Sequence, residues 1–262
     1  RRFSIARGIL ASAGIVNLPR LKTHSLTRMT GALKNTFGAV VGGEKAALHI
    51  RYPDAESFGR MIADVNSLVP SRLVVMDGVR VMEGNGPSGG DLVDLGLLLI
   101  SADPVAIDAV ACRILGIEPL SLPFLRAASE AGLGCAREEE IEIRGEPLAA
   151  WTGRRFSVPA RNPADRVPPA LWRVARSLFI GKPVIDAEAC VACGECVASC
   201  PTSPKSLAQE PGKVPCYSYA GCIRCYCCQE TCPQGAISVR AAPLARLLGG
   251  SSGFPKAGTD RS

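Results

Sequence analysis

Two cysteine runs near the end of the chain constrain its folding more than any other feature of the 262 residues. The first, CVACGECVASCP, begins at Cys190, and the second, CIRCYCCQETCP, begins at Cys222. Both read C-x2-C-x2-C-x3-C-P. This spacing lets three thiolates converge from one tight loop, while the fourth, on the short helix that follows, points across to a neighbouring site. Ten of the twelve cysteines lie between residues 190 and 232, so we expect this segment to fold around the groups that its thiolates bind.

The spacing predicts two [4Fe–4S] clusters, each bound by three cysteines of one run and the last cysteine of the other. A zinc ribbon needs only four ligands in two CxxC pairs, and a disulfide framework is typical of secreted chains, so both alternatives fit less well. The segments PVID (183–186) and AISV (236–239) are expected to pair as short strands around the clusters. Residues 183–240 resemble the two-cluster ferredoxins of bacteria in this respect. The predicted ligands are Cys190, Cys193, Cys196 and Cys232 for one cluster, and Cys222, Cys225, Cys228 and Cys200 for the other.

Two cysteines of this segment have no place in the repeated pattern. Cys216 precedes the second run, and Cys227 lies inside it. The simplest interpretation is that both are small semi-buried side chains near the clusters. The alternative is a role in ligand exchange or redox sensing.

The first 149 residues show the alternation of strands and helices that is typical of an α/β layer structure. Short apolar runs predict buried strands of a mostly parallel sheet. Apolar residues at helical spacing, with Asp54 as the first cap and Pro70 just beyond the end, predict a helix over 54–69. The other expected elements are strands over 14–19, 72–76, 95–101 and 140–145, and helices over 103–116 and 124–132.

A polar segment between residues 18 and 49 contains both histidines of the chain. Cations, hydroxyls and amides on loops that contain glycine suit an anionic ligand such as a phosphate or a carboxylate. A histidine among them can transfer protons near neutral pH. The alternative is a solvated loop with a capping histidine. The candidate residues are Lys22 and Lys34 as cations, His24 as an acid or base, and Thr23 and Asn35 as substrate-binding side chains.

A second polar segment, MDGVRVMEGNGPSGGD (76–91), contains Gly84, Gly86 and Gly89 in a formal G-x-G-x-x-G pattern. A dinucleotide fingerprint requires a helix that opens at its last glycine. Only five residues separate Gly89 from the apolar run at 95, so no helix fits there. We therefore expect an ordered substrate-binding loop at the carboxyl end of a strand. Asp77 is a candidate base or metal ligand, although most such acids are solvated.

Three motifs in order, LPRLKTHSLTRMTGALKNTFG, MDGVRVMEGNGPSGG and SADPVAIDAVAC, resemble the family catalogued as domain of unknown function 362. The resemblance covers about residues 14–135, and some members of the family end in a two-cluster ferredoxin, as this chain does. It supplies no reaction. The chain departs from the family in having Arg20 where many members have lysine, and in lacking the N-terminal portion of the family. The residues at motif positions are Lys22, Thr23, His24, Lys34, Asn35, Asp77, Gly84, Gly86, Asp103 and Asp108.

The net charge of +6 is concentrated between the two domains. Residues 151–183 carry seven basic and one acidic side chain, whereas residues 184–240 carry four and five. A nucleic-acid protein usually spreads basic residues over a folded face, so nucleic acid is not an expected partner. The nearly neutral ferredoxin part favours electron transfer within the chain or to a fixed partner over a freely diffusing carrier.

Membrane insertion is not expected, because the longest apolar run, LGLLLI at 95–100, is far too short to cross a bilayer. Residues 171–180 could form an amphipathic helix, which more often packs on its own domain than on a membrane. Because the first residue is Arg1 rather than methionine, we expect the natural chain to begin earlier. We expect a cytoplasmic protein, with a lost leader as the alternative.

The expected organisation is an α/β domain (1–149), a basic linker (150–182), a small α+β two-cluster ferredoxin-type domain (183–240) and a disordered tail (241–262). The favoured hypothesis is an iron–sulfur oxidoreductase whose clusters pass electrons to or from a small anionic substrate. The alternative is a non-catalytic subunit for electron transfer or cluster handling, which docks on a redox partner protein.

Overall fold

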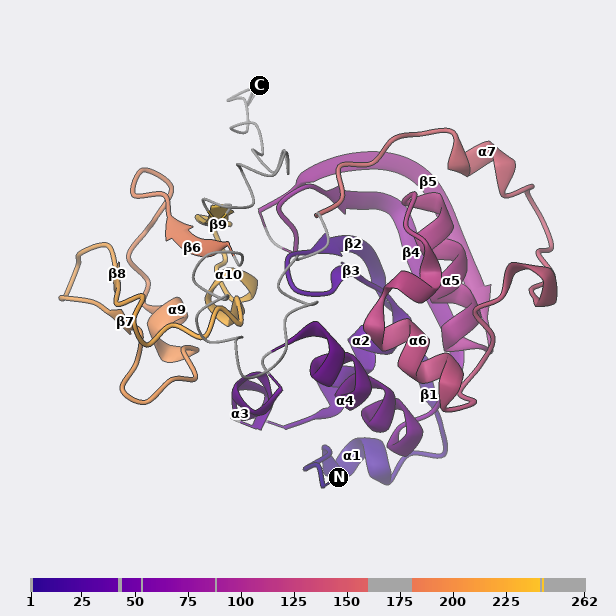
Figure 1. Ribbon diagram of the computed structural model, residues 1–262, viewed down its shortest axis with the longest axis horizontal. Coiled ribbons are helices and arrows are strands. Elements are labelled where there is room, and N and C mark those ends of the chain that lie inside the picture. The colour runs from indigo at the N-terminus through magenta and orange to yellow at the C-terminus, as the bar shows by residue number, and fades with distance from the viewer. Residues whose placement is uncertain are drawn as a thin grey trace.

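The computed structural model describes residues 2–41, 44–52, 54–87, 89–159 and 181–240, together with residue 242. The chain forms a larger unit built on one sheet with helices, and a smaller unit of short strands and helices beside it (Figure 1). The predicted helix at 171–180 and nearly all of the predicted tail lie outside the described residues. Within these ranges, no helix has the length and apolar character that crossing a bilayer requires.

The sheet of the larger unit is organised around one long central strand, β4. Strands β1 and β2 both run parallel to β4 along one of its edges, whereas β5 pairs antiparallel with the other edge. Strand β3 pairs antiparallel with β2. Since β1, β2 and β4 share one direction, the expected α/β domain with a mostly parallel sheet is confirmed, in the form of a mixed sheet. The strands are β1 (Ile15–Asn17), β2 (Arg20–His24), β3 (Arg28–Thr30), β4 (Ser71–Glu83) and β5 (Asp91–Ser101).

The helices of the larger unit pack their apolar side chains into one core with the sheet. The expected helix at 54–69 is confirmed as α4, whose Asp54 side chain accepts a hydrogen bond from the Ser57 amide at 2.8 Å. The expected helices at 103–116 and 124–132 are confirmed as α5 and α6, and Asp103 caps α5. The helices are α1 (Arg7–Leu10), α2 (Ala32–Asn35), α3 (Glu44–Arg51), α4 (Ala55–Leu68), α5 (Pro104–Ile114), α6 (Pro123–Glu130) and α7 (Ala149–Thr152).

Helices α4 and α6 approach so closely at Gly59 that no side chain fits between them. A Cβ atom at this position would lie 2.6 Å from the backbone nitrogen of Phe124. We expect Gly59→Ala to lower the free energy of unfolding by about 1–3 kcal/mol, because backbone atoms would have to move apart. Chemical denaturation measures this, with Gly8→Ala as the control, since a Cβ at Gly8 meets nothing within 4 Å. Equal stability of the two variants would contradict the close approach.

Two expectations for this unit are corrected. The strand predicted at 140–145 does not form: a 3-10 turn, η3 (Glu138–Glu140), precedes irregular chain. Ile141 packs on the core while Ile143 is 42% exposed, and no described strand pairs with this segment. The predicted loop at 76–91 is shorter than expected because β4 continues to Glu83. Two further 3-10 turns are η1 (Thr36–Ala39) and η2 (Pro119–Ser121).

The smaller unit is built from short strands and helices of two to four residues. The expected pairing of 183–186 with 236–239 is confirmed, since β6 and β9 pair antiparallel with Ile185 opposite Ile237. The elements are β6 (Lys182–Ile185), α9 (Glu195–Ala198), β7 (Leu207–Ala208), β8 (Cys216–Tyr217), α10 (Cys227–Glu230) and β9 (Ile237–Arg240).

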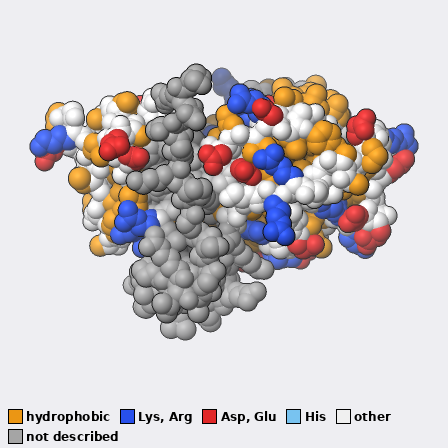
Figure 2. All heavy atoms as spheres, turned by 90° about the horizontal axis from the view of Figure 1, so that it is seen from above, with side chains coloured by type: hydrophobic (Ala, Val, Ile, Leu, Met, Phe, Trp, Pro, Cys, Tyr) orange, Lys and Arg blue, Asp and Glu red, His pale blue; other side chains and the backbone are white. Residues whose placement is uncertain are grey.

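On the face of the whole molecule that Figure 2 shows, basic and acidic side chains are interspersed.

Candidate functional site

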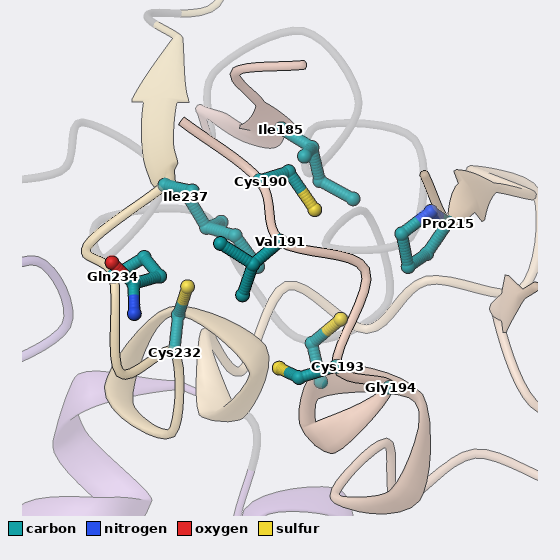
Figure 3. A pocket seen from close by; sticks show the side chains of 11 residues that line it. Ile185, Cys190, Val191, Cys193, Gly194, Pro215, Cys232, Gln234 and Ile237 are labelled. Atoms are coloured by element: carbon teal, nitrogen blue, oxygen red, sulfur yellow. The ribbon is translucent and has the colours of Figure 1, made fainter. Parts of the chain in front are cut away.

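The first candidate site is a small pocket in the ferredoxin-type unit, lined by Cys190, Cys193, Cys196 and Cys232. In Figure 3 the sulfur atoms of Cys190, Cys193 and Cys232 point toward this pocket, with Ile185 and Ile237 beside them. Three of the four cysteines come from the first run and one from the second. The structure therefore brings together the four side chains that the spacing predicts as one ligand set.

The second candidate site is a pocket lined by Cys200, Cys222, Cys225 and Cys228, which again combines three cysteines of one run with the last cysteine of the other. The Tyr217 hydroxyl lies 3.1 Å from the Sγ atom of Cys228. Four thiols around a pocket walled by apolar side chains are the donor set that iron–sulfur clusters use. Both pockets thus fit the group that the sequence predicts.

The two cysteine runs fold into the same loop, as their backbone angles show. Ala192 and Arg224 occupy equivalent positions and both have left-handed conformations, with φ of 55° and 57°. Gly194 and Tyr226 are also equivalent, with φ of 80° and 61°. A non-glycine residue is held in this region at a cost of about 1–3 kcal/mol when its surroundings fix it. Tyr226 is fixed in this way, because it is buried and its hydroxyl donates to the Gly181 carbonyl at 2.9 Å.

A third, much larger cavity of about 780 Å³ lies between the two units. Cys200 lines this cavity as well as the second cysteine pocket, so the cavity adjoins that candidate cluster site directly. The α/β domain contributes Lys22, His24, Thr30, Lys34, Asn35, Phe37, Gly38, Lys45, Ala47, His49 and Pro87, and the ferredoxin-type unit contributes Ala198, Ser199, Cys200, Pro201, Lys205, Cys227, Glu230 and Thr231.

Glu230 connects the ferredoxin-type unit to the polar residues of the α/β domain. Its Oε1 atom lies 2.5 Å from His24 Nε2 and 3.6 Å from Lys34 Nζ. The Leu26 amide donates to His24 Nδ1 at 3.0 Å, so Nε2 carries the proton and donates to Glu230. His24 and Lys34 are both buried, which makes this a specific contact between the units.

Burial and neighbouring charges set the protonation states of this contact. Burial, with a further contribution from Lys34, lowers the pKa of His24 to about 4, so the ring is neutral at neutral pH. Burial opposes ionisation of Glu230, yet Lys34 and His24 hold the pKa of its carboxyl well below the usual range. Burial and Lys34 also lower the pKa of Lys22. At neutral pH the wall therefore holds a carboxylate, a neutral imidazole and at least one lysine that loses its proton more readily than usual.

A second set of contacts joins the loop after β4 to α10. The Gln229 side chain donates to Asn85 Oδ1 at 3.0 Å and accepts from the Ser25 hydroxyl at 3.0 Å. Thr23 is fully buried, and its hydroxyl donates to the Gly84 carbonyl at 3.1 Å. The loop at 84–90 therefore serves as an interface with the ferredoxin-type unit.

The structure separates the predicted site residues into two groups. Lys22, His24, Lys34 and Asn35 meet at the cavity. The predicted substrate-binding glycines pack against backbone instead. A Cβ at Gly86 would collide with the Thr23 carbonyl of the same domain, and one at Gly89 would lie 3.1 Å from the Gly235 carbonyl of the ferredoxin-type unit. Thr23, Gly84, Gly86 and Gly89 are not among the residues that line the cavity.

Asp77, the predicted base or metal ligand, lies away from the cavity in β4. Its Oδ2 atom accepts a hydrogen bond from Arg20 Nε at 3.0 Å, and both side chains are exposed to solvent. The Val79 amide donates to its other oxygen at 3.0 Å. These contacts hold Asp77 to Arg20 and to its own strand, and Asp77 is not among the residues that line the cavity.

Sequence reasoning did not find the contribution of the ferredoxin-type unit to the cavity. Glu230 lies between two predicted ligands, Cys228 and Cys232, where an acidic residue could have drawn attention as a charge next to a cluster. Its partners are about 200 residues away in the sequence, so nothing local could have identified them.

Asp108, a motif position without an assigned role, fixes the helix that carries Lys34. Its two carboxylate oxygens accept hydrogen bonds from the Ala32 and Leu33 amides, at 2.6 and 3.0 Å. The side chain is fully buried, and burial raises its pKa to about 7. Its carboxylate lies so close to Gly31 that a Cβ there would collide with it. Asp108 thus positions α2 at the edge of the cavity.

Two protein families match separate parts of the chain. Residues 1–113 match the family described as Domain of unknown function (DUF362). Residues 182–237 match the family described as 4Fe-4S dicluster domain, which identifies an iron–sulfur protein.

A curated relative covers part of the chain. "Thylakoid-associated protein sll1697" of Synechocystis sp. (strain ATCC 27184 / PCC 6803 / Kazusa) is 39% identical over 120 residues. These residues make up 45% of this chain and 37% of the relative, so the similarity spans little more than a third of that protein. The chain thus joins a region that matches the DUF362 family, residues 1–113, to a region that matches the 4Fe–4S dicluster domain family, residues 182–237.

Proposed function

We propose that this protein binds two [4Fe–4S] clusters and passes electrons between them and a small anionic substrate held in the cavity. The observation that carries the proposal is the position of Cys200, which lines both the second cysteine pocket and the cavity. A substrate in this cavity would lie next to a cluster ligand, and short distances favour electron transfer. The opposite wall supplies Lys22 and Lys34, which attract an anion.

The clusters would be held by the two cysteine sets that line the pockets. The first pocket lies at the surface, since Cys193 is exposed and Val191 is 62% exposed. This surface suits a redox partner protein that exchanges electrons with the first cluster. The second cluster would connect the first to the cavity. When bound, the clusters supply one-electron redox chemistry, and the residues of this chain hold and orient the substrate beside them.

The neutral His24 and the ionised Glu230 give the cavity a fixed polar wall. His24 donates to Glu230 and accepts from two backbone amides, so its ring is held in one orientation. Lys22 is half-buried, with a lowered pKa, which favours a lysine that can both bind an anion and give up a proton. Lys22 is proposed to bind the substrate and to handle a proton that accompanies electron transfer, while His24 and Glu230 hold each other in place beside it.

We expect the double variant Lys22→Met/His24→Ala to keep both clusters and to lose the bound small molecule. Native mass spectrometry of protein purified without oxygen would measure both. The expected wild-type mass is that of the chain with two [4Fe–4S] clusters and one additional small molecule. Lys213→Met is the matched control, because Lys213 pairs with Glu210 on the surface and does not line the cavity.

Two outcomes would contradict the proposal. A variant that retains the small molecule would remove Lys22 and His24 from the binding site. A wild-type mass with two clusters and nothing more would favour the alternative, in which the protein is a non-catalytic electron-transfer subunit that docks on a redox partner.

A further inference from the structure

The sulfur atoms of the two candidate cluster sites differ in their side-chain hydrogen bonds. In the second site, the Tyr217 hydroxyl lies 3.1 Å from Cys228 Sγ, and the Thr202 hydroxyl lies 3.3 Å from Cys200 Sγ. Both hydroxyls belong to residues that line this pocket together with the cysteines. Besides its cysteines, the first pocket is lined by apolar side chains, a glycine and Gln234. Within the described residues, no hydrogen bond joins Gln234 to a ligand sulfur.

Both hydroxyls act as donors, because a cysteine sulfur that binds iron has lost its proton and can only accept. The Thr202 oxygen accepts from the Ser206 amide at 2.8 Å and lies 2.9 Å from the Ser206 hydroxyl. The Ser206 hydroxyl can therefore donate to Thr202, while the Thr202 proton is directed at Cys200. The Tyr217 ring stacks on the Tyr219 ring with centroids 5.2 Å apart, which holds its hydroxyl in place.

Backbone amides are expected to contribute alike at the two sites. The two cysteine runs fold into the same loop, with matching left-handed residues at equivalent positions. Amide donors to the ligand sulfurs depend on this loop geometry. The hydroxyls of Tyr217 and Thr202 are therefore the donors by which the second site differs from the first.

The two sites also differ in their access to water. Cys193 and Val191 of the first site are exposed, whereas Cys222 and Cys228 of the second site are each 8% exposed. Adding an electron to a cluster increases its negative charge, and burial disfavours that charge. Hydrogen bonds to the sulfur atoms stabilise the added charge and so raise the reduction potential. A buried cluster without such donors would have a lower potential than an exposed one, and electrons would stay at the surface.

We propose that the Tyr217 and Thr202 hydroxyls take the place of water at the buried second site and raise its reduction potential above that of the first, so that electrons move toward the cavity. This inference rests on the two clusters of the proposed function and adds the direction of electron transfer. A one-electron carrier protein would supply an electron at the exposed first site. The first cluster is then oxidised as this electron passes to the second, which is reduced. The second site adjoins the cavity through Cys200.

The test is a redox titration of the cluster-loaded protein, followed by electron paramagnetic resonance. The wild type should show two one-electron steps. Tyr217→Phe and Thr202→Val should each lower the potential of the higher step and leave the lower step unchanged, since each removes one donor to a sulfur of the second site. The two substitutions together should shift the distribution of one electron between the clusters about tenfold toward the first, which corresponds to about 59 mV.

Two further variants separate these hydrogen bonds from the packing of the pocket. Tyr226→Phe is the matched control, because Tyr226 lines the same pocket but its hydroxyl donates to the Gly181 carbonyl at 2.9 Å rather than to a sulfur. Both potentials of this control should equal those of the wild type. Thr202→Ser retains the hydroxyl and should restore the potential that Thr202→Val lowers. An equal fall in Tyr226→Phe and Tyr217→Phe would show that packing, not the hydrogen bond, sets the potential.

The remaining outcomes separate this inference from the proposed function. Unchanged potentials in Tyr217→Phe and Thr202→Val would overturn the inference, while the two clusters of the proposed function would stand. A fall in the lower of the two potentials would overturn the inferred direction of electron transfer. Iron analysis that finds fewer than two clusters in the wild type would overturn the proposed function itself. If Thr202→Val fails to bind its clusters, Tyr217→Phe decides alone, because its hydroxyl has no second hydrogen bond in the described part of the chain.

Discussion

Replacing Cys232 with alanine is expected to remove the cluster that we propose for Cys190, Cys193 and Cys196, and to leave the other proposed cluster in place. The reason is the exchange of ligands between the runs, since Cys232 belongs to the second run but lines the first pocket. Iron analysis should show a fall from about eight to about four irons per chain. Electron paramagnetic resonance of the reduced variant should show one cluster signal without coupling to a second.

Two further substitutions test whether the loss is specific to one cluster. Cys200→Ala should remove the other cluster, because Cys200 lies in the second pocket with Cys222, Cys225 and Cys228. Cys216→Ala should keep both clusters, because Cys216 is exposed and lines neither pocket. Loss of the same cluster from both ligand variants would contradict the exchanged assignment.

Asp108→Ala is expected to lower the free energy of unfolding of the α/β domain. The substitution leaves the buried Ala32 and Leu33 amides without their acceptors. Each unsatisfied buried donor costs about 1–3 kcal/mol, so the free energy of unfolding should fall by about 2–6 kcal/mol. This is a large part of the total stability of a typical domain, about 5–15 kcal/mol. Denaturant unfolding of the cluster-loaded protein measures the change.

Two comparisons show whether the hydrogen bonds are responsible. Asp108→Asn keeps one acceptor oxygen and should lose less stability than Asp108→Ala. Asp94→Ala removes a carboxylate whose side chain is 84% exposed and should change the free energy of unfolding by less than about 1 kcal/mol. A small effect of Asp108→Ala would show that Asp108 does not hold α2 in place.

Features with a local cause could be predicted from the sequence. The helix at Ala55–Leu68 follows from apolar residues at helical spacing and from the Asp54 cap. The strands on either side of the cysteine runs follow from short apolar segments. The grouping of the cysteines into two pockets agrees with their spacing, because three ligands of each set lie within one loop.

Features that depend on distant partners could not be predicted in this way. In the segment at 140–145, charged and apolar residues alternate as they do in a strand. This alternation shows that one face of the segment is apolar, but a strand also needs a neighbouring strand to pair with. Strand β4 extends to Glu83 because β5 pairs with it from Val74 to Glu83, including Arg80 opposite Asp94. The contact of His24 with Glu230 depends on how the two domains meet, and neither residue contains that information.

The position of Glu230 on the helix that also carries Cys228 has a consequence for the order in which the protein matures. Helix α10 is one turn long, and so short a helix has no stability of its own in water. In the proposed holoprotein, the bond from Cys228 to a cluster fixes this helical turn. The fixed turn places Glu230 against His24. In a chain without its clusters, only the contacts of Gln229 and Glu230 with the α/β domain would hold this side of the cavity. Substrate would then bind more tightly to molecules that carry the clusters and can exchange electrons with it.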